Sequence, residues 1–360
     1  APAGPMHQNP AMADLLSLPG LQGLTHPIIQ APMAGSQGAA LALAVGEAGA
    51  LGSLPAAMLT PEALALDIER VAATGRPFNV NFFCHTPPVP DEAREARWRQ
   101  ALAPYYAEAG IDPATIAAGP GRRPFDEAAL AVLERFRPPV VSFHFGLPEA
   151  RLLARVKALG ASVWSSATTV DEARWLVQHG VDVVIAQGLE AGGHRGHFLD
   201  SDLTRQMGTF ALLPQVVVAV DVPVIAAGGI MDAASVAAAR ALGAAGVQVG
   251  TAFLLAPEAT TGPVHRAALQ SPRAVHTALT RVFSGRPARG IVNRVMRELG
   301  PMSEAPPDFP LATAAIAPLR AWAEQAGSGD FSPLWAGQHA CAARAVPAAE
   351  VVRALARGWA

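Results

Sequence analysis

The residues best suited to chemistry lie in one stretch, VVIAQGLEAGGHRGH, at residues 183–197. Its first half is apolar, as a parallel strand buried on both faces would be, and this run ends at Gln187. Glycines then precede His194, Arg195 and His197. Glycine lets the backbone approach a bound group, and histidine exchanges a proton near neutral pH. Because α/β proteins carry their chemistry on loops at the carboxyl ends of strands, we predict an active-site loop here.

Two later strand ends carry the second candidate feature, a phosphate site. Their turns contain Gly228 and Gly229 in one case, and Gln248, Val249, Gly250 and Thr251 in the other. Backbone N–H groups at such turns can approach an anion, and many barrels bind phosphate after their seventh and eighth strands. Simple chain turns are the alternative for either segment alone, but the pair in this order favours a phosphate-bearing cofactor. No G-x-G-x-x-G follows a strand and no Walker A motif occurs, which disfavours a dinucleotide fold or a nucleoside triphosphatase.

Other expected strand ends supply polar and small residues for the wall of the same site. Asn81 shares a strand face with Asn79, and a buried amide needs a hydrogen-bond partner, either in the site or in neighbouring backbone. His144 ends the fourth expected strand. The first strand leads into Ala31, Pro32 and Met33, where a flat ring could lie.

Several other kinds of chemistry find little support. His194 and His197 could ligate a metal, but no third ligand has a supporting spacing, so no metal site is predicted. There is no G-x-S-x-G elbow, and neither Cys84 nor Cys341 has an activating context. Ser284 lies in a polar, glycine-rich, basic segment, residues 284–290, which is equally consistent with a surface loop and with a lid over the ligand.

The elements that must position these residues alternate regularly. Short apolar or β-branched runs are separated by helical patterns, and we expect strands at 26–33, 50–54, 78–83, 140–144, 162–165, 183–187, 223–227 and 246–251. Such alternation predicts a parallel sheet, and eight strands close into a (β/α)8 TIM barrel. An open doubly wound sheet is the alternative.

Two segments are longer than normal connections. Residues 84–138 read as an elaborated loop with one or two helices, and residues 255–333 as a helical lobe that caps the barrel mouth. The expected organisation is therefore a barrel of residues 1–254 plus 334–360, with the last barrel helix over 335–357, and a capping substrate lobe over 255–333. Long insertions at strand carboxyl ends usually shape a substrate pocket.

Composition limits the class of protein. Of 360 residues, 51% are hydrophobic and 16% are charged, which supplies ample core, and the net charge of −2 gives no electrostatic case for nucleic acid or a membrane surface. Two cysteines make no disulfide framework, and no apolar run is long enough to span a membrane. We expect a soluble, cytoplasmic protein without nucleic-acid or membrane partners. The oligomeric state stays open, including a homodimer through apolar outer helices.

Several of these segments together resemble the nitronate monooxygenase family, formerly called 2-nitropropane dioxygenases. The resemblance is carried in family order by QAPMAG at 30–35, VN at 80–81, SFHFG at 142–146, AQGLEAGGHRG at 186–196, PVIAAGGI at 223–230, QVGTAFL at 248–254, FSGRPARG at 283–290 and AGQ at 336–338. Part of it is shared with flavin-dependent enoyl-acyl carrier protein reductases. The insertion at 84–138 departs from the compact members of the family, and it bears on the size of the substrate.

The resemblance implies an FMN-dependent barrel that oxidises nitronates or nitroalkanes with O2 to a carbonyl compound and nitrite. His194 would be the catalytic residue, as a base or as an anion stabiliser, and His144 and Ser284 would belong to the substrate pocket. The residues implied in FMN binding are Ala31, Pro32, Met33, Asn81, Gln187, Gly192, Gly193, Gly228, Gly229, Gln248, Val249, Gly250 and Thr251. The alternatives are an NAD(P)H-using flavin reductase of enoyl thioesters or quinones, and a barrel that binds a phosphorylated metabolite without redox chemistry.

Overall fold

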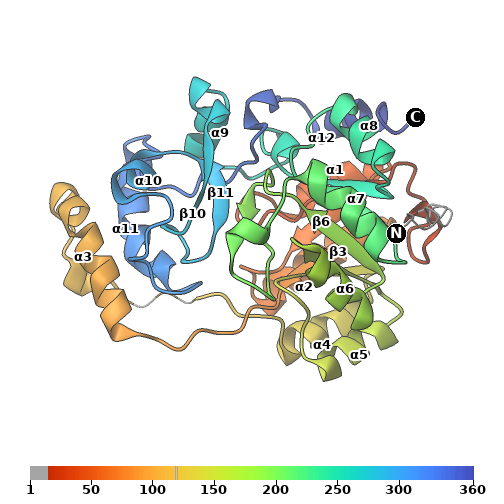
Figure 1. Cartoon of the computed structure of the whole chain (residues 1–360), viewed down its shortest axis with the longest axis horizontal. Helices are drawn as coiled ribbons and strands as arrows, with labels where there is room; N and C mark the ends of the chain where they lie inside the picture. Colours follow the sequence, from red (N-terminus) through yellow and green to blue (C-terminus); the bar gives the residue numbers. More distant parts are fainter. Residues whose placement is uncertain (1–14, 118, 120) are drawn as a thin grey trace, which may run out of the picture.

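The computed structural model describes residues 15–117, 119 and 121–360, and its centre is a barrel of eight parallel strands (Figure 1). The strands are β1 (Ile28–Gln30), β2 (Gly52–Pro55), β3 (Phe78–Phe83), β4 (Val140–His144), β5 (Ser162–Ala167), β6 (Val183–Gln187), β8 (Val224–Ala227) and β9 (Gly246–Val249). The sheet order is β1-β9-β8-β6-β5-β4-β3-β2. Leu51 closes the ring, because its N–H donates to Ile28 and its carbonyl accepts from Gln30, each at 2.9 Å. The predicted TIM barrel is confirmed.

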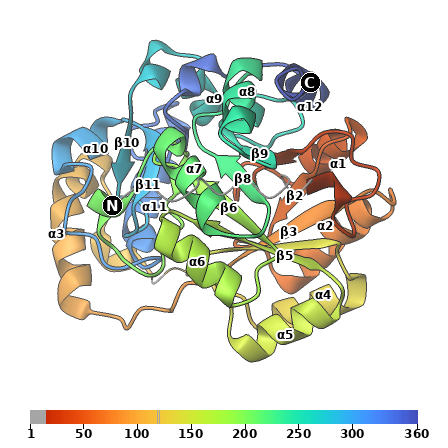
Figure 2. The same ribbon diagram turned by 45° about the vertical axis from the view of Figure 1, so that its right-hand side comes forward.

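Helices between the strands cover the outside of the barrel, as Figure 2 shows for α4, α5 and α6. They are α1 (Ala39–Glu47), α2 (Pro61–Ala72), α4 (Glu127–Phe136), α5 (Ala150–Ala158), α6 (Val170–Gln178), α7 (Thr209–Ala219), α8 (Ala233–Ala241) and α12 (Ala348–Ala356). Side-chain caps begin several of them: Thr60 accepts from Ala63 N–H at 3.2 Å, and Asp232 forms a capping box with Ser235. Helix α12 packs against both α1 and α8 and completes the ring.

The last helix is shorter than the sequence suggested. We expected it over residues 335–357, but α12 begins only at Ala348, directly after Pro347. A proline has no N–H to donate and favours the start of a helix over its interior, and Pro347 is the N-cap residue of α12. Residues 335–347 are irregular apart from the single turn η6 (Ala340–Ala342).

Side chains alternate along each strand between the core under the helices and the core inside the barrel, and the inward row leads to the site. On β6, Val184 and Ala186 pack under the helices, whereas Val183 and Ile185 belong to the cluster inside the barrel. Gln187 is next in the inward row, because side chains two apart on a strand share a face. The inward rows therefore end in side chains that ring the barrel mouth.

The lobe after β9 consists of α9 (Pro263–Leu269), η5 (Pro272–Val275), α10 (Arg294–Leu299), α11 (Ala312–Gln325) and a ribbon of β10 (Thr277–Thr280) and β11 (Ala288–Ile291). The sequence reading did not anticipate this ribbon. It continues into the active-site loop, because β11 pairs with the two-residue strand β7 (Gly193–His194). The remaining single turns are η1 (Leu15–Ser17), η2 (Pro113–Thr115), η3 (Leu203–Arg205) and η4 (Thr251–Phe253).

Helix α3 (Glu92–Ala109) belongs to the long 84–138 connection but packs on the lobe beside α11, at the left of Figure 1. The Trp98 indole donates to the Ala312 carbonyl at 3.0 Å, and the Tyr106 hydroxyl donates to the Ala315 carbonyl at 2.6 Å. We propose that the substrate lobe comprises α3 together with residues 255–333. Within the described residues, no helix is both long and apolar enough to cross a membrane.

Candidate active site

A cavity of about 200 Å³ lies at the carboxyl ends of the barrel strands. The structure brings the sequence-predicted residues together around it: it is lined by Ala31, Pro32, Met33, Asn81, His144, Gln187, Gly192, Gly193, His194, Gly228, Gly229, Gln248, Val249, Gly250 and Thr251. Ser284 does not line the cavity, but its hydroxyl lies 2.8 Å from Nε2 of His194. His197 is buried away from the lining.

His194 is held from both the barrel and the lobe. Its strand β7 pairs with β11 through the register His194 to Ala288. From the barrel side, Gln187 Nε2 donates to the His194 carbonyl at 3.0 Å, and His144 Nε2 lies 3.2 Å from the same oxygen. Among the described residues, no hydrogen bond engages Nδ1 of His194. Nε2 of His194 is thus engaged by Ser284, whereas Nδ1 is available for a hydrogen bond or a proton.

Arg195 ties the loop that carries His194 to the end of β6. This side chain is fully buried, and its guanidinium donates to the carbonyls of Gln187 (2.7 Å) and Gly188 (2.6 Å) and to Gln206 Oε1 (2.8 Å). Burial lowers the pKa of Arg195 to about 9. The basic residue beside His194 therefore supports the end of β6 and does not face the cavity.

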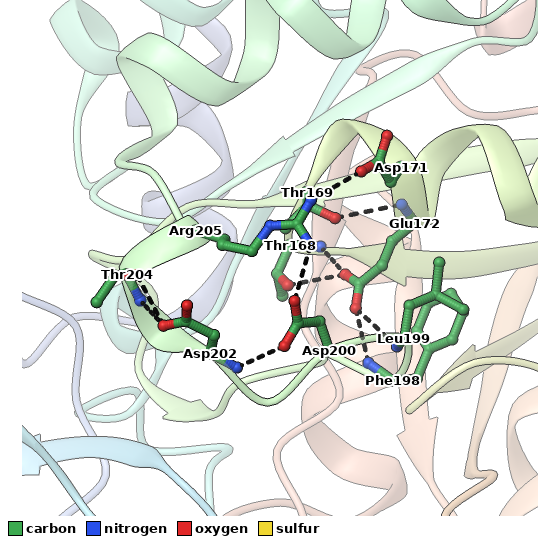
Figure 3. Close-up of polar contacts among 10 residues, drawn as sticks. All are labelled: Thr168, Thr169, Asp171, Glu172, Phe198, Leu199, Asp200, Asp202, Thr204 and Arg205. Carbon is green, nitrogen blue, oxygen red and sulfur yellow. Dashed lines mark hydrogen bonds and ion pairs between the residues drawn. The ribbon is translucent and has the colours of Figure 1, made fainter.

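A buried carboxylate, Glu172 on α6, anchors the far side of the same loop (Figure 3). It accepts from the N–H and hydroxyl of Thr168, both at 2.7 Å, and from the N–H groups of Phe198 (2.7 Å) and Leu199 (3.3 Å). Nearer the surface, Arg205 pairs with Asp171 and Asp200. The loop that carries His194 is thus fixed at both ends.

The histidines of the site are held in the neutral form. Burial, with smaller contributions from Arg122, His144 and Arg286, lowers the pKa of His194 well below its usual value. Burial likewise lowers the pKa of His144 to about 3 and that of His85 to about 4. A neutral imidazole has one ring nitrogen able to accept a proton, which is the form a general base requires.

Aromatic rings surround the His194 imidazole. The ring centroids of Phe309 and Trp335 lie 5.1 Å and 5.5 Å from it, and those of Phe145 and Phe83 lie 6.1 Å and 6.3 Å away. Such a wall excludes water, which strengthens electrostatic interactions inside and protects reactive species.

Other residues of the lining have the features of a cradle for a phosphate-bearing ring. Gln248 Oε1 is buried there without a hydrogen-bond partner among the described residues, so it can accept from a ring N–H. Gly229 has a φ of 73°, a conformation that side chains disfavour, and within the described chain neither its N–H nor that of Gly250 has a partner. A Cβ at Gly192 would stand 2.6 Å from the Ala336 carbonyl carbon, so only glycine fits there.

Several lining residues were missed. Phe83 and Ser166 continue the inward rows of β3 and β5, and the alternation on these strands could have identified them. Arg122, Trp335 and His339 lie in irregular segments, where no periodic signal marks the side of the chain that faces the cavity.

Comparisons with known proteins find relatives that match nearly the whole chain. The sequence model of the nitronate monooxygenase family matches residues 17–358. Nitronate monooxygenases from Pseudomonas aeruginosa and Paraburkholderia phytofirmans are 44% and 43% identical; the alignments cover 93% and 94% of this chain and 96% and 93% of theirs. The nitroalkane oxidase structure from Streptomyces ansochromogenes matches with a TM-score of 0.85 at 42% identity, over 93% of this chain and 95% of that one. FabK from Thermotoga maritima matches more distantly, with a TM-score of 0.69 at 27% identity and 93% coverage of both chains.

Proposed function

The chain belongs to the nitronate monooxygenase family of oxidoreductases, and on this premise we propose that it binds FMN and oxidises nitronates or nitroalkanes with O2 to a carbonyl compound and nitrite. The observation that carries the proposal is the neutral, water-shielded His194 imidazole facing a cavity whose other wall fits a phosphate-bearing ring. The substrate is a small molecule, since the cavity is enclosed by the barrel mouth and the lobe.

The residues present fit a flavin mononucleotide. Gly228, Gly229 and the Gly250–Thr251 turn would hold the phosphate, and Gln248 would accept from the ring system. Ala31, Pro32 and Met33 would line the ring face. When bound, the flavin would supply the electron transfer and the oxygen activation.

His194 would act as the general base toward neutral nitroalkanes. Their α-carbon proton is acidic because the resulting nitronate delocalises its charge onto the nitro oxygens. If Nε2–H donates to Ser284 Oγ, the free Nδ1 lone pair can take that proton. The lowered pKa supports the base over an imidazolium that stabilises an anion. A nitronate arrives without this proton and needs no base.

The first test is the visible spectrum of freshly purified protein and the identity of the flavin it releases. We expect flavin bands, release of FMN, and oxygen uptake driven by nitronates such as ethyl nitronate with formation of nitrite. A colourless protein would contradict the proposal and support a barrel that binds a phosphorylated metabolite.

The second candidate is an NAD(P)H-dependent flavin reductase of enoyl thioesters or quinones. It is favoured by the structural match to FabK and by the motifs shared with flavin-dependent enoyl reductases. Rapid anaerobic bleaching of the flavin by NADH would select it. Slow bleaching together with nitronate-driven oxygen uptake would select the first proposal.

A further inference from the structure

A second cavity, of about 300 Å³, adjoins the first at the barrel mouth and shares Arg122 with it. It lies between the long connection after β3 and the lobe. Trp98 of α3 forms one wall, and Pro310, Leu311 and Ala314 at the start of α11 form another. Nothing in the proposed chemistry at His194 uses this space.

Two side chains, Arg122 and Phe309, lie where the two cavities meet. The ring of Phe309 lies 5.1 Å from that of His194 on the side of the first cavity, and its chain neighbour Pro310 lines the second. The Arg122 guanidinium carbon lies 5.9 Å from the centre of the Phe309 ring and reaches both spaces. Arg122 and Phe309 therefore lie between the His194 imidazole and the second cavity.

The Glu95 carboxylate lines the second cavity together with Arg122, which carries a positive charge. Among the described residues Arg122 forms no ion pair, and its backbone carbonyl is held by Nε2 of His85 at 3.0 Å. Burial lowers the pKa of this guanidinium, although an arginine stays protonated in proteins. A half-buried cation that lacks a partner favours the binding of an anion beside it.

The walls of the second cavity are mostly apolar, and two of its polar side chains are engaged in hydrogen bonds. Arg99 donates to the carbonyls of Pro113 (3.0 Å) and Ile116 (3.1 Å). The hydroxyl of Thr313 donates to the Phe283 carbonyl at 3.1 Å. An alkyl chain would therefore meet mainly apolar side chains, with the Glu95 carboxylate at one place in the lining, and burial against the apolar part favours its transfer from water.

We propose that the second cavity is a subsite for the alkyl chain of extended primary nitronates, with the anionic head between His194 and Arg122 and the chain passing Phe309. This inference rests on the proposed oxidation of nitronates. It assigns to the 84–138 connection and to α11 the selection of substrate length.

The test is a series of nitronates made from nitroethane, 1-nitrobutane, 1-nitrohexane and 1-nitrooctane, offered to the FMN-loaded enzyme with oxygen uptake as the readout. We expect kcat/KM to rise about three- to fourfold for each methylene that enters the cavity. A kcat/KM that does not change with chain length overturns the subsite. Absence of uptake with every nitronate, ethyl nitronate included, overturns the proposed function instead.

A variant that fills the cavity sharpens the result. Ala314→Phe should remove the gain with chain length, by at least tenfold for octyl nitronate, and leave ethyl nitronate within about twofold of wild type. The control is Ala321→Phe, on the exposed side of the same helix, which should keep the gain. A gain that survives in a folded Ala314→Phe protein contradicts the proposal.

One further measurement needs no variant and so remains decisive if Ala314→Phe fails to fold. Octanoate should inhibit the oxidation of ethyl nitronate competitively, at least tenfold more strongly than acetate. Equal inhibition by the two carboxylates would overturn the chain-binding subsite.

Discussion

Replacing the proposed base is the sharpest perturbation that the structure offers. In His194→Asn the backbone contacts from Gln187, His144 and β11 to this residue are retained, because they engage its main chain. The asparagine amide ends near the position of Nδ1, so it loses the contact that Nε2 makes with Ser284, and it cannot accept a proton. The variant should therefore fold and retain its flavin, which isolates the chemical role of the imidazole.

The size of the effect follows from the protonation state. Since the pKa of His194 is lowered well below its usual value, the imidazole is fully neutral at pH 7 and the whole contribution of the base is available there. General-base catalysis by a positioned side chain contributes about 10²–10⁴-fold, or about 3–5 kcal/mol of transition-state stabilisation. We expect kcat/KM for neutral nitroethane to fall by that factor, and kcat/KM for ethyl nitronate to change by less than about tenfold.

The assay is oxygen uptake with each substrate across pH, beside the flavin content of each preparation. For the wild type on nitroethane, the rate should stay level from pH 8 down to pH 6 and fall only at lower pH, because a depressed pKa keeps the base form until acid is reached. Wild-type turnover of neutral nitroethane by His194→Asn would refute the base role. An equal loss with both substrates would instead indicate a role in binding.

Three further predictions concern the frame of the site. Glu172→Gln places an amide N–H against backbone donors and should lower the free energy of unfolding by about 2–4 kcal/mol in denaturant titrations. The control is Asp171→Asn at an exposed position, which should change the free energy of unfolding by less than about 1 kcal/mol. Equal effects of the two substitutions would contradict this prediction. Gly192→Ala should lose bound flavin, measured by absorbance, because the new Cβ would clash with residues 336–337. The control is Gly38→Ala, because a Cβ at Gly38 would meet open space. A full flavin content in Gly192→Ala would contradict the prediction. Acid should destabilise the fold between about pH 6.5 and 4, because histidines with lowered pKa values bind protons mainly when the protein is unfolded; each such histidine should cost roughly 2 kcal/mol of stability by pH 5. His197→Leu removes one histidine with a pKa of about 3 and should flatten the profile of melting temperature against pH. An unchanged profile would contradict this prediction.

The sequence predicted the parts of the site that rest on regular strands. The run at 183–187 is apolar because β6 is covered on both faces, and the polar Gln187 marks the point where the inward row reaches the cavity. Likewise, the glycine turns after β8 and β9 follow strands that their composition identifies. At these positions the residue that ends a strand pattern in the sequence is also the residue that reaches the cavity in the fold, so the pattern was enough to identify it.

Other parts of the site could not be predicted in this way. Strand β7 has two residues, and its pairing with β11 is set by tertiary contact, because two residues carry no periodicity. Arg122, which lines both cavities, and Phe309, whose ring lies 5.1 Å from that of His194, come from irregular segments that carry no periodic pattern. Ser284, left open between surface and lid, is buried against His194.

The position of the His194 imidazole thus depends on both the barrel and the lobe. Gln187 and Glu172 fix the loop to the barrel, whereas β11 and Ser284 fix it to the lobe. Because the lobe also forms the walls of the second cavity, a change in how α3 packs on α11 would alter both substrate length selection and the placement of His194. Length selection and proton transfer are therefore expected to vary together when the lobe is perturbed, and separately when only the end of β6 is perturbed.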